Sequence, residues 1–209
     1  MSGFKREHLV FILRKLHSLT GIVPIGAFLV FHLFENSHAL KGPEAYNHMV
    51  EGIASIPLIR FMEIFFIWIP ILYHAIYGVV LVFGSRPNVK KYPEYFNNWM
   101  YTFQRWSGII AFAFIGWHFW GTWMQGYLYG ETIDFNMMKE IVASPWQMAF
   151  YIIGVGAAVY HFSNGIWTFC ISWGITIGPR SQKIVHGVCL LLGLVVFLVA
   201  LNTLFAFKV

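Results

Sequence analysis

The sequence predicts an all-α membrane protein with five transmembrane helices and a cytoplasmic N-terminus. Of its 209 residues, 58% are hydrophobic and only 11% are charged, and it contains 21 Phe, 10 Tyr and 9 Trp. A soluble core of this size could not bury so much apolar surface. The apolar residues gather in five long stretches, and the basic residues collect on one side of the membrane that these stretches define. We interpret residues 1–209 as a single transmembrane domain with a four-helix core.

Each of the five apolar stretches is long enough to span a bilayer, which takes about 20 helical residues. They cover residues 15–34, 57–83, 103–124, 145–173 and 183–206. Pro57 and Pro145 lie near expected helix starts, whereas Pro24 and Pro70 lie inside helices and are expected to kink them. The first stretch has no small-residue cleavage site, so we expect a retained helix and not a signal peptide.

The distribution of charge predicts the orientation in the membrane. The positive-inside rule places Lys and Arg in the cytoplasm. With a cytoplasmic N-terminus, ten basic residues lie inside: Lys5, Arg6, Arg14, Lys15, Arg86, Lys90, Lys91, Arg105, Arg180 and Lys183. Four lie outside: Lys41, Arg60, Lys139 and Lys208. No basic stripe of the kind that binds nucleic acid is present, which argues against nucleic-acid binding.

One histidine lies in each of the first four apolar stretches: His32, His74, His118 and His161. At about 1.5 Å of rise per residue, His32 and His118 fall near the outer face, and His74 and His161 fall at a central to inner depth. Intramembrane histidines are costly and usually functional. Two pairs at two depths, each bridging two helices, predict bis-histidine ligation of two b-type haems stacked in the bundle.

Residues near these histidines agree with haem binding. Gly78 and Gly165 follow His74 and His161 by four residues, on the same helix face, where glycine leaves room for a flat macrocycle. Haem propionates need cations or polar donors, and the candidates are Arg14, His17, Ser18, Arg180 and Lys183. For His186, a structural role and a role at the haem edge are both open.

Other interpretations of the histidines remain open at this point. They could form a single four-histidine metal site, a proton relay in a transporter, or packing contacts in a haem-free structural membrane protein. The two depths argue against one site that holds all four. The two cysteines, Cys170 and Cys189, lie in neither a CxxC nor a CxxCH motif, so covalent haem attachment and a zinc knot are excluded.

Long contiguous segments of the chain resemble the cytochrome b558 membrane-anchor subunits of Gram-positive-type succinate:menaquinone reductases, which are related to dihaem fumarate reductases. The segments are RKLHSLTGIVPIG at 14–26, FHL at 31–33, MEIFFIWIPILYHAIYG at 62–78, NNWMYTFQRWSGI at 97–109, GWHFW at 116–120, YHFSNGIWTF at 160–169 and SWGITIGPRSQK at 172–183. The resemblance implies that His32, His74, His118 and His161 are the four axial haem ligands.

The resemblance also implies partners and a reaction. The family's anchor holds a flavoprotein with FAD and an iron–sulfur protein on the cytoplasmic face of the bacterial cell membrane. This chain has neither a dinucleotide fingerprint nor a cysteine cluster, so we expect no succinate site on it. Electrons would pass from the iron–sulfur subunit to the inner haem, then to the outer haem, and then to menaquinone.

Reduction of a quinone takes up two protons, and three carboxylates are candidates to supply them: Glu35, Glu51 and Glu63. Each of them could equally be a solvated carboxylate at the membrane rim. The alternative assignments are the dihaem cytochrome b subunit of a quinol:fumarate reductase or of another membrane dehydrogenase, such as formate dehydrogenase or hydrogenase. The direction of the reaction in the cell is left open.

Overall fold

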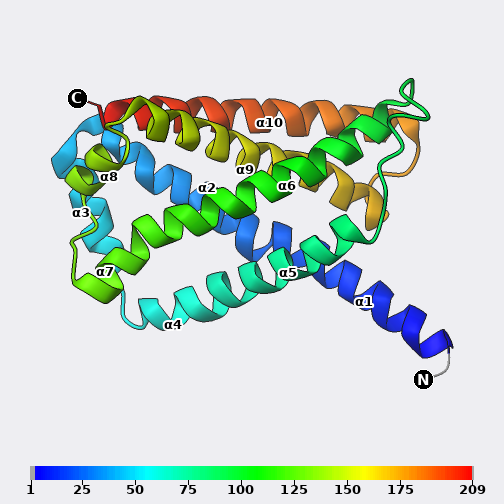
Figure 1. Ribbon diagram of the computed structural model, residues 1–209, viewed down its shortest axis with the longest axis horizontal. Helices are drawn as coiled ribbons and strands as arrows, with labels where there is room; N and C mark the ends of the chain where they lie inside the picture. The colour runs from blue at the N-terminus through cyan, green and yellow to red at the C-terminus, as the bar shows by residue number, and fades with distance from the viewer. Residues whose placement is uncertain (1–2, 209) are drawn as a thin grey trace.

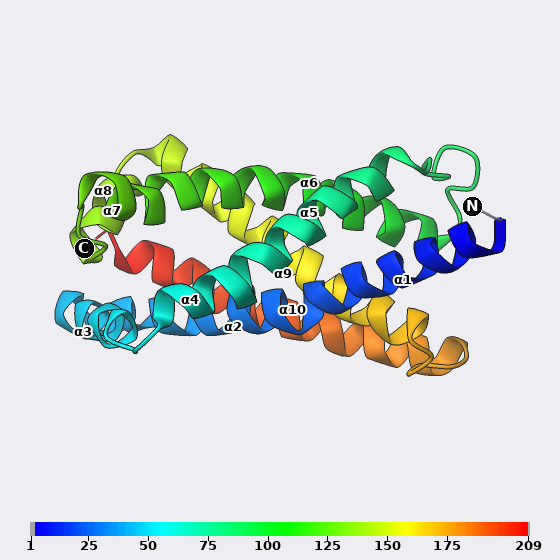
Figure 2. The same ribbon diagram turned by 90° about the horizontal axis from the view of Figure 1, so that it is seen from below.

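The computed structural model describes residues 3–208, and all regular secondary structure within this range is helical. Long helices run roughly along one axis, and short helices cover one end (Figures 1 and 2). In chain order they are α1 (Gly3–Ile22), α2 (Pro24–Asn36), η1 (Ser37–Lys41), α3 (Pro43–Ala54), α4 (Ile59–Glu63), η2 (Ile64–Trp68), α5 (Ile69–Phe83), α6 (Phe96–Gly121), α7 (Trp123–Tyr129), α8 (Phe135–Ile141), α9 (Pro145–Ser172) and α10 (Pro179–Ala206). The all-α fold class is therefore confirmed.

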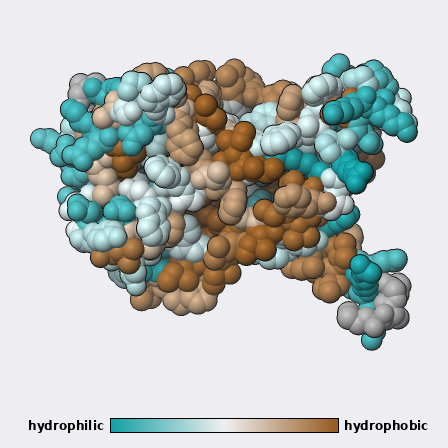
Figure 3. Space-filling view, in the orientation of Figure 1, coloured by the Kyte–Doolittle hydropathy of each residue, from teal (hydrophilic) through white to brown (hydrophobic). Residues whose placement is uncertain are grey.

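The bundle has two distinct ends. What we call the N-terminal end carries the N-terminus and the connections α5–α6 and α9–α10, and the C-terminal end carries α3, α7, α8 and the C-terminus (Figure 1). Hydrophilic residues gather at both ends, and hydrophobic residues dominate the surface between them (Figure 3). An apolar belt between two polar ends is the surface that a bilayer requires of a spanning protein.

Four helical segments of the described chain are long and apolar enough to cross a membrane. They are Lys5–Lys41, Ile59–Phe83, Pro145–Ser172 and Pro179–Ala206. The remaining predicted stretch, 103–124, lies mostly in α6, which runs between the same two ends (Figure 1) but carries Gln104 and Arg105 among other polar residues in its first turns. A membrane protein is thus established, and the fifth span stays a prediction.

Helix boundaries differ from the predicted ones mainly at polar ends. Helical structure begins at Gly3 and not at residue 15, because the basic N-terminal segment continues the helix. Both internal prolines disturb their helices as expected. Val23 separates α1 from α2, whose first residue is Pro24, and the π-helical turn η2 ends just before Pro70. Proline lacks an amide hydrogen and its ring clashes with the preceding turn, which accounts for both irregularities.

The best-packed part of the bundle is formed by α6, α9 and α10, with α9 in the middle. Along α9 the buried residues run from Met148 to Trp167. At Gly154 the approach of α6 is so close that a Cβ atom would lie 2.1 Å from Cγ of Phe114. The absence of a side chain at this position therefore sets the distance between α6 and α9.

We predict that Gly154→Ala lowers the free energy of unfolding by about 1–3 kcal/mol, the usual cost of overpacking a closely packed core. Gly187→Ala in α10 is the matched control, since a Cβ there meets nothing within 4 Å. Alanine also favours a helix over glycine, so the control should be neutral or slightly stabilised. Denaturant unfolding of the purified protein in detergent measures both, and equal stability of the two variants would contradict this packing.

Candidate functional site

The four predicted histidines lie in two pairs, and each pair bridges two helices. In the α2–α6 pair the ring centroids of His32 and His118 are 5.8 Å apart, with an angle of 60° between the ring planes. In the α5–α9 pair the centroids of His74 and His161 are 6.1 Å apart, with an angle of 86°. Two imidazoles that share one metal ion through bonds of about 2 Å have centroids roughly 6 Å apart. Both separations are therefore compatible with two imidazoles that share one metal ion.

In the α5–α9 pair, backbone carbonyl groups of neighbouring helices fix both rings. Nδ1 of His74 lies 2.9 Å from the carbonyl oxygen of His17 in α1. Nδ1 of His161 lies 2.9 Å from the carbonyl oxygen of Gln104 in α6. Carbonyl oxygens can only accept hydrogen bonds, so both Nδ1 atoms carry the proton and donate it. The Nε2 atom of each ring consequently keeps its lone pair.

In the α2–α6 pair, side chains fix the rings. Nδ1 of His32 lies 2.8 Å from Oε1 of Glu35, and Nδ1 of His118 lies 3.1 Å from the hydroxyl oxygen of Tyr151. Asn36 Nδ2 donates to the carbonyl oxygen of His32 at 2.7 Å and makes only a long contact of 3.5 Å with Nε2 of that ring.

A hydrogen bond at Nδ1 that leaves Nε2 free is the usual arrangement of a metal-binding histidine. His74 and His161 have this arrangement, and His32 and His118 also make their shortest hydrogen bond at Nδ1, so the donor set fits two metal-centred groups with two imidazole ligands each. Among the residues that the structure describes, no three His, Cys, Asp or Glu side chains cluster in a way that could hold a bare metal ion. The alternative of one four-histidine metal site is therefore not supported.

Two glycines on neighbouring helices make room for the rings of the α5–α9 pair. A Cβ atom at Gly21 would lie 2.5 Å from Cε1 of His74, and one at Gly108 would lie 2.8 Å from Cε1 of His161. Any side chain at either position would displace the imidazole that rests on it. These glycines belong to α1 and α6, and sequence reasoning missed them.

The glycines predicted to make room for the cofactor have other neighbours. A Cβ at Gly78 would lie 3.2 Å from Cε1 of His17, and one at Gly165 would lie 3.5 Å from Nε2 of Gln104. Gly78 and Gly165 share a helix face with His74 and His161 but do not lie against their rings, because these rings pack against glycines of neighbouring helices.

Of the predicted propionate ligands, His17 lies closest to a histidine pair. Its ring stacks on that of His74 with a centroid separation of 4.0 Å, and its buried Nδ1 atom has no hydrogen-bond partner among the described residues. Ser18 accepts a hydrogen bond of 3.1 Å from Nε1 of Trp173. An unpartnered polar atom beside the pair fits a polar group of a bound cofactor.

The cationic candidates Arg14, Arg180 and Lys183 are all exposed at the N-terminal end of the bundle. Lys15, one residue after Arg14, instead donates a hydrogen bond to the carbonyl oxygen of Ser172 and so ties α1 to the end of α9. The side chains of Arg14, Arg180 and Lys183 are thus exposed cations near this end of the bundle.

The three candidate carboxylates have different surroundings. Oε1 of Glu35 is hydrogen-bonded to Nδ1 of His32. Glu63 accepts hydrogen bonds from Arg60 Nη1 at 2.9 Å and from Trp123 Nε1 at 3.2 Å, while Glu51 is exposed on α3. Only Glu35 touches a member of a histidine pair.

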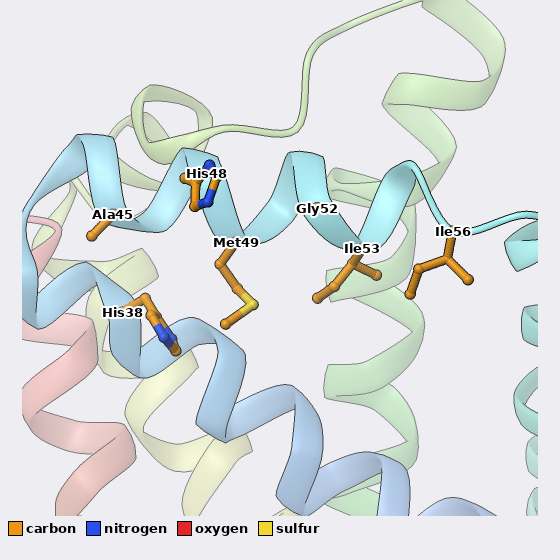
Figure 4. A pocket seen from close by; sticks show the side chains of 7 residues that line it. All are labelled: His38, Ala45, His48, Met49, Gly52, Ile53 and Ile56. Atoms are coloured by element: carbon orange, nitrogen blue, oxygen red, sulfur yellow. The ribbon is translucent and has the colours of Figure 1, made fainter.

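The C-terminal end also contains a shallow groove of about 280 Å³ between η1 and α3. His38 of η1 and the α3 residues His48 and Met49 line it (Figure 4). None of the four paired histidines contributes to this groove, so it is separate from both pairs.

Tyr151 and Gln104 were also absent from the sequence-based candidates. Tyr151 is 2% exposed and fixes His118, whereas Gln104 accepts from His161 through its carbonyl and from Asn164 Nδ2, at 2.7 Å, through its side chain. Amides such as Gln104 and Asn164 within apolar stretches are a signal that sequence analysis can use. A tyrosine among 21 Phe, 10 Tyr and 9 Trp carries no such signal.

Helices that cross an apolar belt and bring imidazoles together in pairs define an integral membrane protein with candidate bis-histidine cofactor sites. Comparison with known proteins agrees with this class. Residues 85–201 match the family described as succinate dehydrogenase/fumarate reductase transmembrane subunit. The chain is also 42% identical to the succinate dehydrogenase cytochrome b558 subunit of Bacillus subtilis (strain 168) over 207 residues, which cover 99% of this chain and 100% of the relative. The chain therefore belongs to this family of transmembrane subunits, as its resemblance indicated.

We predict that Tyr151→Phe lowers the free energy of unfolding by about 1–3 kcal/mol, because it leaves the buried Nδ1 of His118 without its hydrogen-bond partner. The ring and its packing are preserved. Tyr129→Phe is the control, since that side chain is 67% exposed on α7. If denaturant unfolding in detergent gives the same midpoint for Tyr151→Phe, Tyr129→Phe and the wild type, the bond to His118 does not stabilise the protein.

Proposed function

We propose that this chain is the membrane-anchor dihaem cytochrome b subunit of a succinate:menaquinone oxidoreductase. The observation that carries the proposal is the set of four imidazoles in two pairs, in which every ring makes its shortest hydrogen bond through Nδ1. Membership of the family narrows the choice among membrane cytochromes, and similarity to a succinate dehydrogenase subunit of Bacillus subtilis favours succinate dehydrogenase over fumarate reductase.

In this proposal the chain crosses the bacterial cell membrane five times, and α6 is the third span. The N-terminal end lies in the cytoplasm, because ten of the fourteen Lys and Arg residues belong to the N-terminal segment, to the connections at that end and to the helix ends beside them. The exposed connection that contains Arg86, Lys90 and Lys91 is the docking surface that we assign to the flavoprotein and iron–sulfur subunits.

His74 and His161 would hold the inner haem b, and His32 and His118 the outer one. When bound, the two haems supply the one-electron chemistry that connects the iron–sulfur subunit with menaquinone near the outer face. The hydrogen bonds at Nδ1 orient the four imidazole rings in advance, so the rings would need little rearrangement when haem binds. His17, with its unpartnered Nδ1, and the cations Arg14, Arg180 and Lys183 are the residues that would receive the propionates of the inner haem.

Protons for the quinone would be taken up at the C-terminal end, which faces outward in this orientation. Glu51 is exposed there and Glu63 is half-buried between Arg60 and Trp123, so both can exchange protons with that side. Moving an electron across the membrane is worth about 2.3 kcal/mol per 100 mV. Proton uptake outside would therefore let the membrane potential assist reduction of the quinone.

The haem sites are tested by the dithionite-reduced minus oxidised optical spectrum, with haem quantified per chain. We predict two b-type haems in the wild type and loss of one centre in His161→Ala. His8→Ala is the control, since His8 is exposed in α1, outside both pairs. No haem in the wild type, or an unchanged spectrum in His161→Ala, would show that the histidines are packing or transport residues.

The position of the quinone site is tested with a quinone-site inhibitor of the naphthoquinone class. We predict that it shifts the spectrum and the midpoint potential of the outer haem and leaves those of the inner haem unchanged. The two centres are distinguished by the one that is missing in His161→Ala. An inhibitor that perturbs only the inner haem would place quinone reduction on the cytoplasmic side and remove the role of the membrane potential.

A further inference from the structure

The four Nδ1 acceptors differ in charge. His74 and His161 donate to backbone carbonyl oxygens, and Nδ1 of His118 is hydrogen-bonded to the neutral hydroxyl of Tyr151, which can accept or donate. His32 alone is bonded to a carboxylate, since its Nδ1 lies 2.8 Å from Oε1 of Glu35. Three of the acceptors are therefore neutral, and the fourth is an ionisable acid.

The contact between His32 and Glu35 is built into the helix and protected from solvent. The two residues are three positions apart in the last turns of α2, so their side chains lie on the same face of the helix. Only 16% of the Glu35 side chain and 30% of the His32 side chain are exposed. A hydrogen bond between partly buried groups is weakened by water and salt less than a surface contact is.

Neighbouring residues keep the backbone of this turn in place. Asn36 donates from Nδ2 to the carbonyl oxygen of His32 at 2.7 Å, and the hydroxyl of Tyr46 in α3 donates to Oδ1 of Asn36 at 3.4 Å. Burial, and secondarily the nearby Glu35 carboxylate, raise the pKa of Tyr46, so its hydroxyl remains a donor. The end of α2 that carries His32 and Glu35 is thereby tied to α3.

A carboxylate at Nδ1 does two things to a metal-bound imidazole. It fixes the tautomer in which Nε2 is the ligand, and it increases electron donation from the ring to the metal. Greater donation favours the ferric over the ferrous state, and hydrogen bonding to axial ligands is one of the means by which a protein sets a haem potential. The backbone carbonyl groups that accept from His74 and His161 fix the tautomer without adding a charge.

We propose that Glu35 is a positioning residue for His32, and that its charge lowers the midpoint potential of a haem held by the α2–α6 pair. This inference rests on the proposed function, because it requires haem at that pair. In this proposal Glu35 acts on the axial ligand His32 and does not deliver protons to the quinone. The other two carboxylates proposed from the sequence, Glu51 and Glu63, make no contact with a paired histidine.

The test is an optical redox titration of Glu35→Gln in isolated membranes that contain the full complex. Glutamine retains an oxygen that can accept from Nδ1 and removes only the charge. We expect both haems to be retained and the potential of one to rise. A tenfold weaker preference for the ferric state corresponds to a rise of about 59 mV for one electron. The haem that is missing in His161→Ala should keep its potential in Glu35→Gln.

Two further variants complete the experiment. Glu44→Gln removes one negative charge from an exposed position at the same end, in the first turn of α3, and should leave both potentials unchanged. Glu35→Asp keeps the negative charge, so its haem midpoint potentials should lie closer to those of the wild type than the potentials of Glu35→Gln do. Loss of only the α2–α6 haem in Glu35→Gln would also support a positioning role.

The inference is overturned if Glu35→Gln binds both haems with the same two potentials as Glu44→Gln, or if Glu35→Asp shifts as far as Glu35→Gln. These outcomes leave the proposed function intact. Absence of haem from the wild type would instead refute the proposed function itself, so the two failures are distinguishable.

Discussion

The orientation of four imidazole rings by hydrogen bonds at Nδ1 is the constraint on which the rest of this structure depends. Each ring is held by an acceptor that is 2.8 to 3.1 Å from Nδ1. A buried imidazole N–H without an acceptor is costly, so the acceptors decide which nitrogen remains free. They come from α1, α6, α9 and the end of α2, and consequently several helices must be in register before either pair can form.

The pairs also join two parts of the bundle that pack differently. The helices α6, α9 and α10 form a closely packed core, whereas α2 buries only Gly26 and α5 buries no residue completely. Each pair links one helix of the core to one of these loosely packed helices. A group bound between two imidazoles would therefore stabilise the contact of α2 with α6 and of α5 with α9. Cofactor binding between the paired histidines would therefore be linked to assembly of the bundle.

Much of this arrangement could be predicted from the sequence. Apolar length and composition predicted the helical membrane fold, and helix rise alone predicted which histidines would pair, because depth depends only on position along a span. Contacts between helices could not be predicted in this way. The groups that contact the rings lie far from them along the chain, so these contacts depend on the rotation of each helix about its own axis. They are Gly21, Gly108, Tyr151 and the carbonyl of Gln104. The bond of Glu35 to His32 lies within one turn, yet the side-chain rotamers that form it are set by the tertiary structure.

The most direct test of this account is electron paramagnetic resonance of the oxidised protein, which reports the spin state of ferric haem and the angle between its axial ligand planes. Ring planes at 86° in one pair and 60° in the other predict two low-spin signals, both strongly anisotropic, as expected for imidazole planes that are far from parallel. A high-spin signal in place of either one, or a low-spin signal typical of parallel planes, would contradict the proposed bis-histidine ligation.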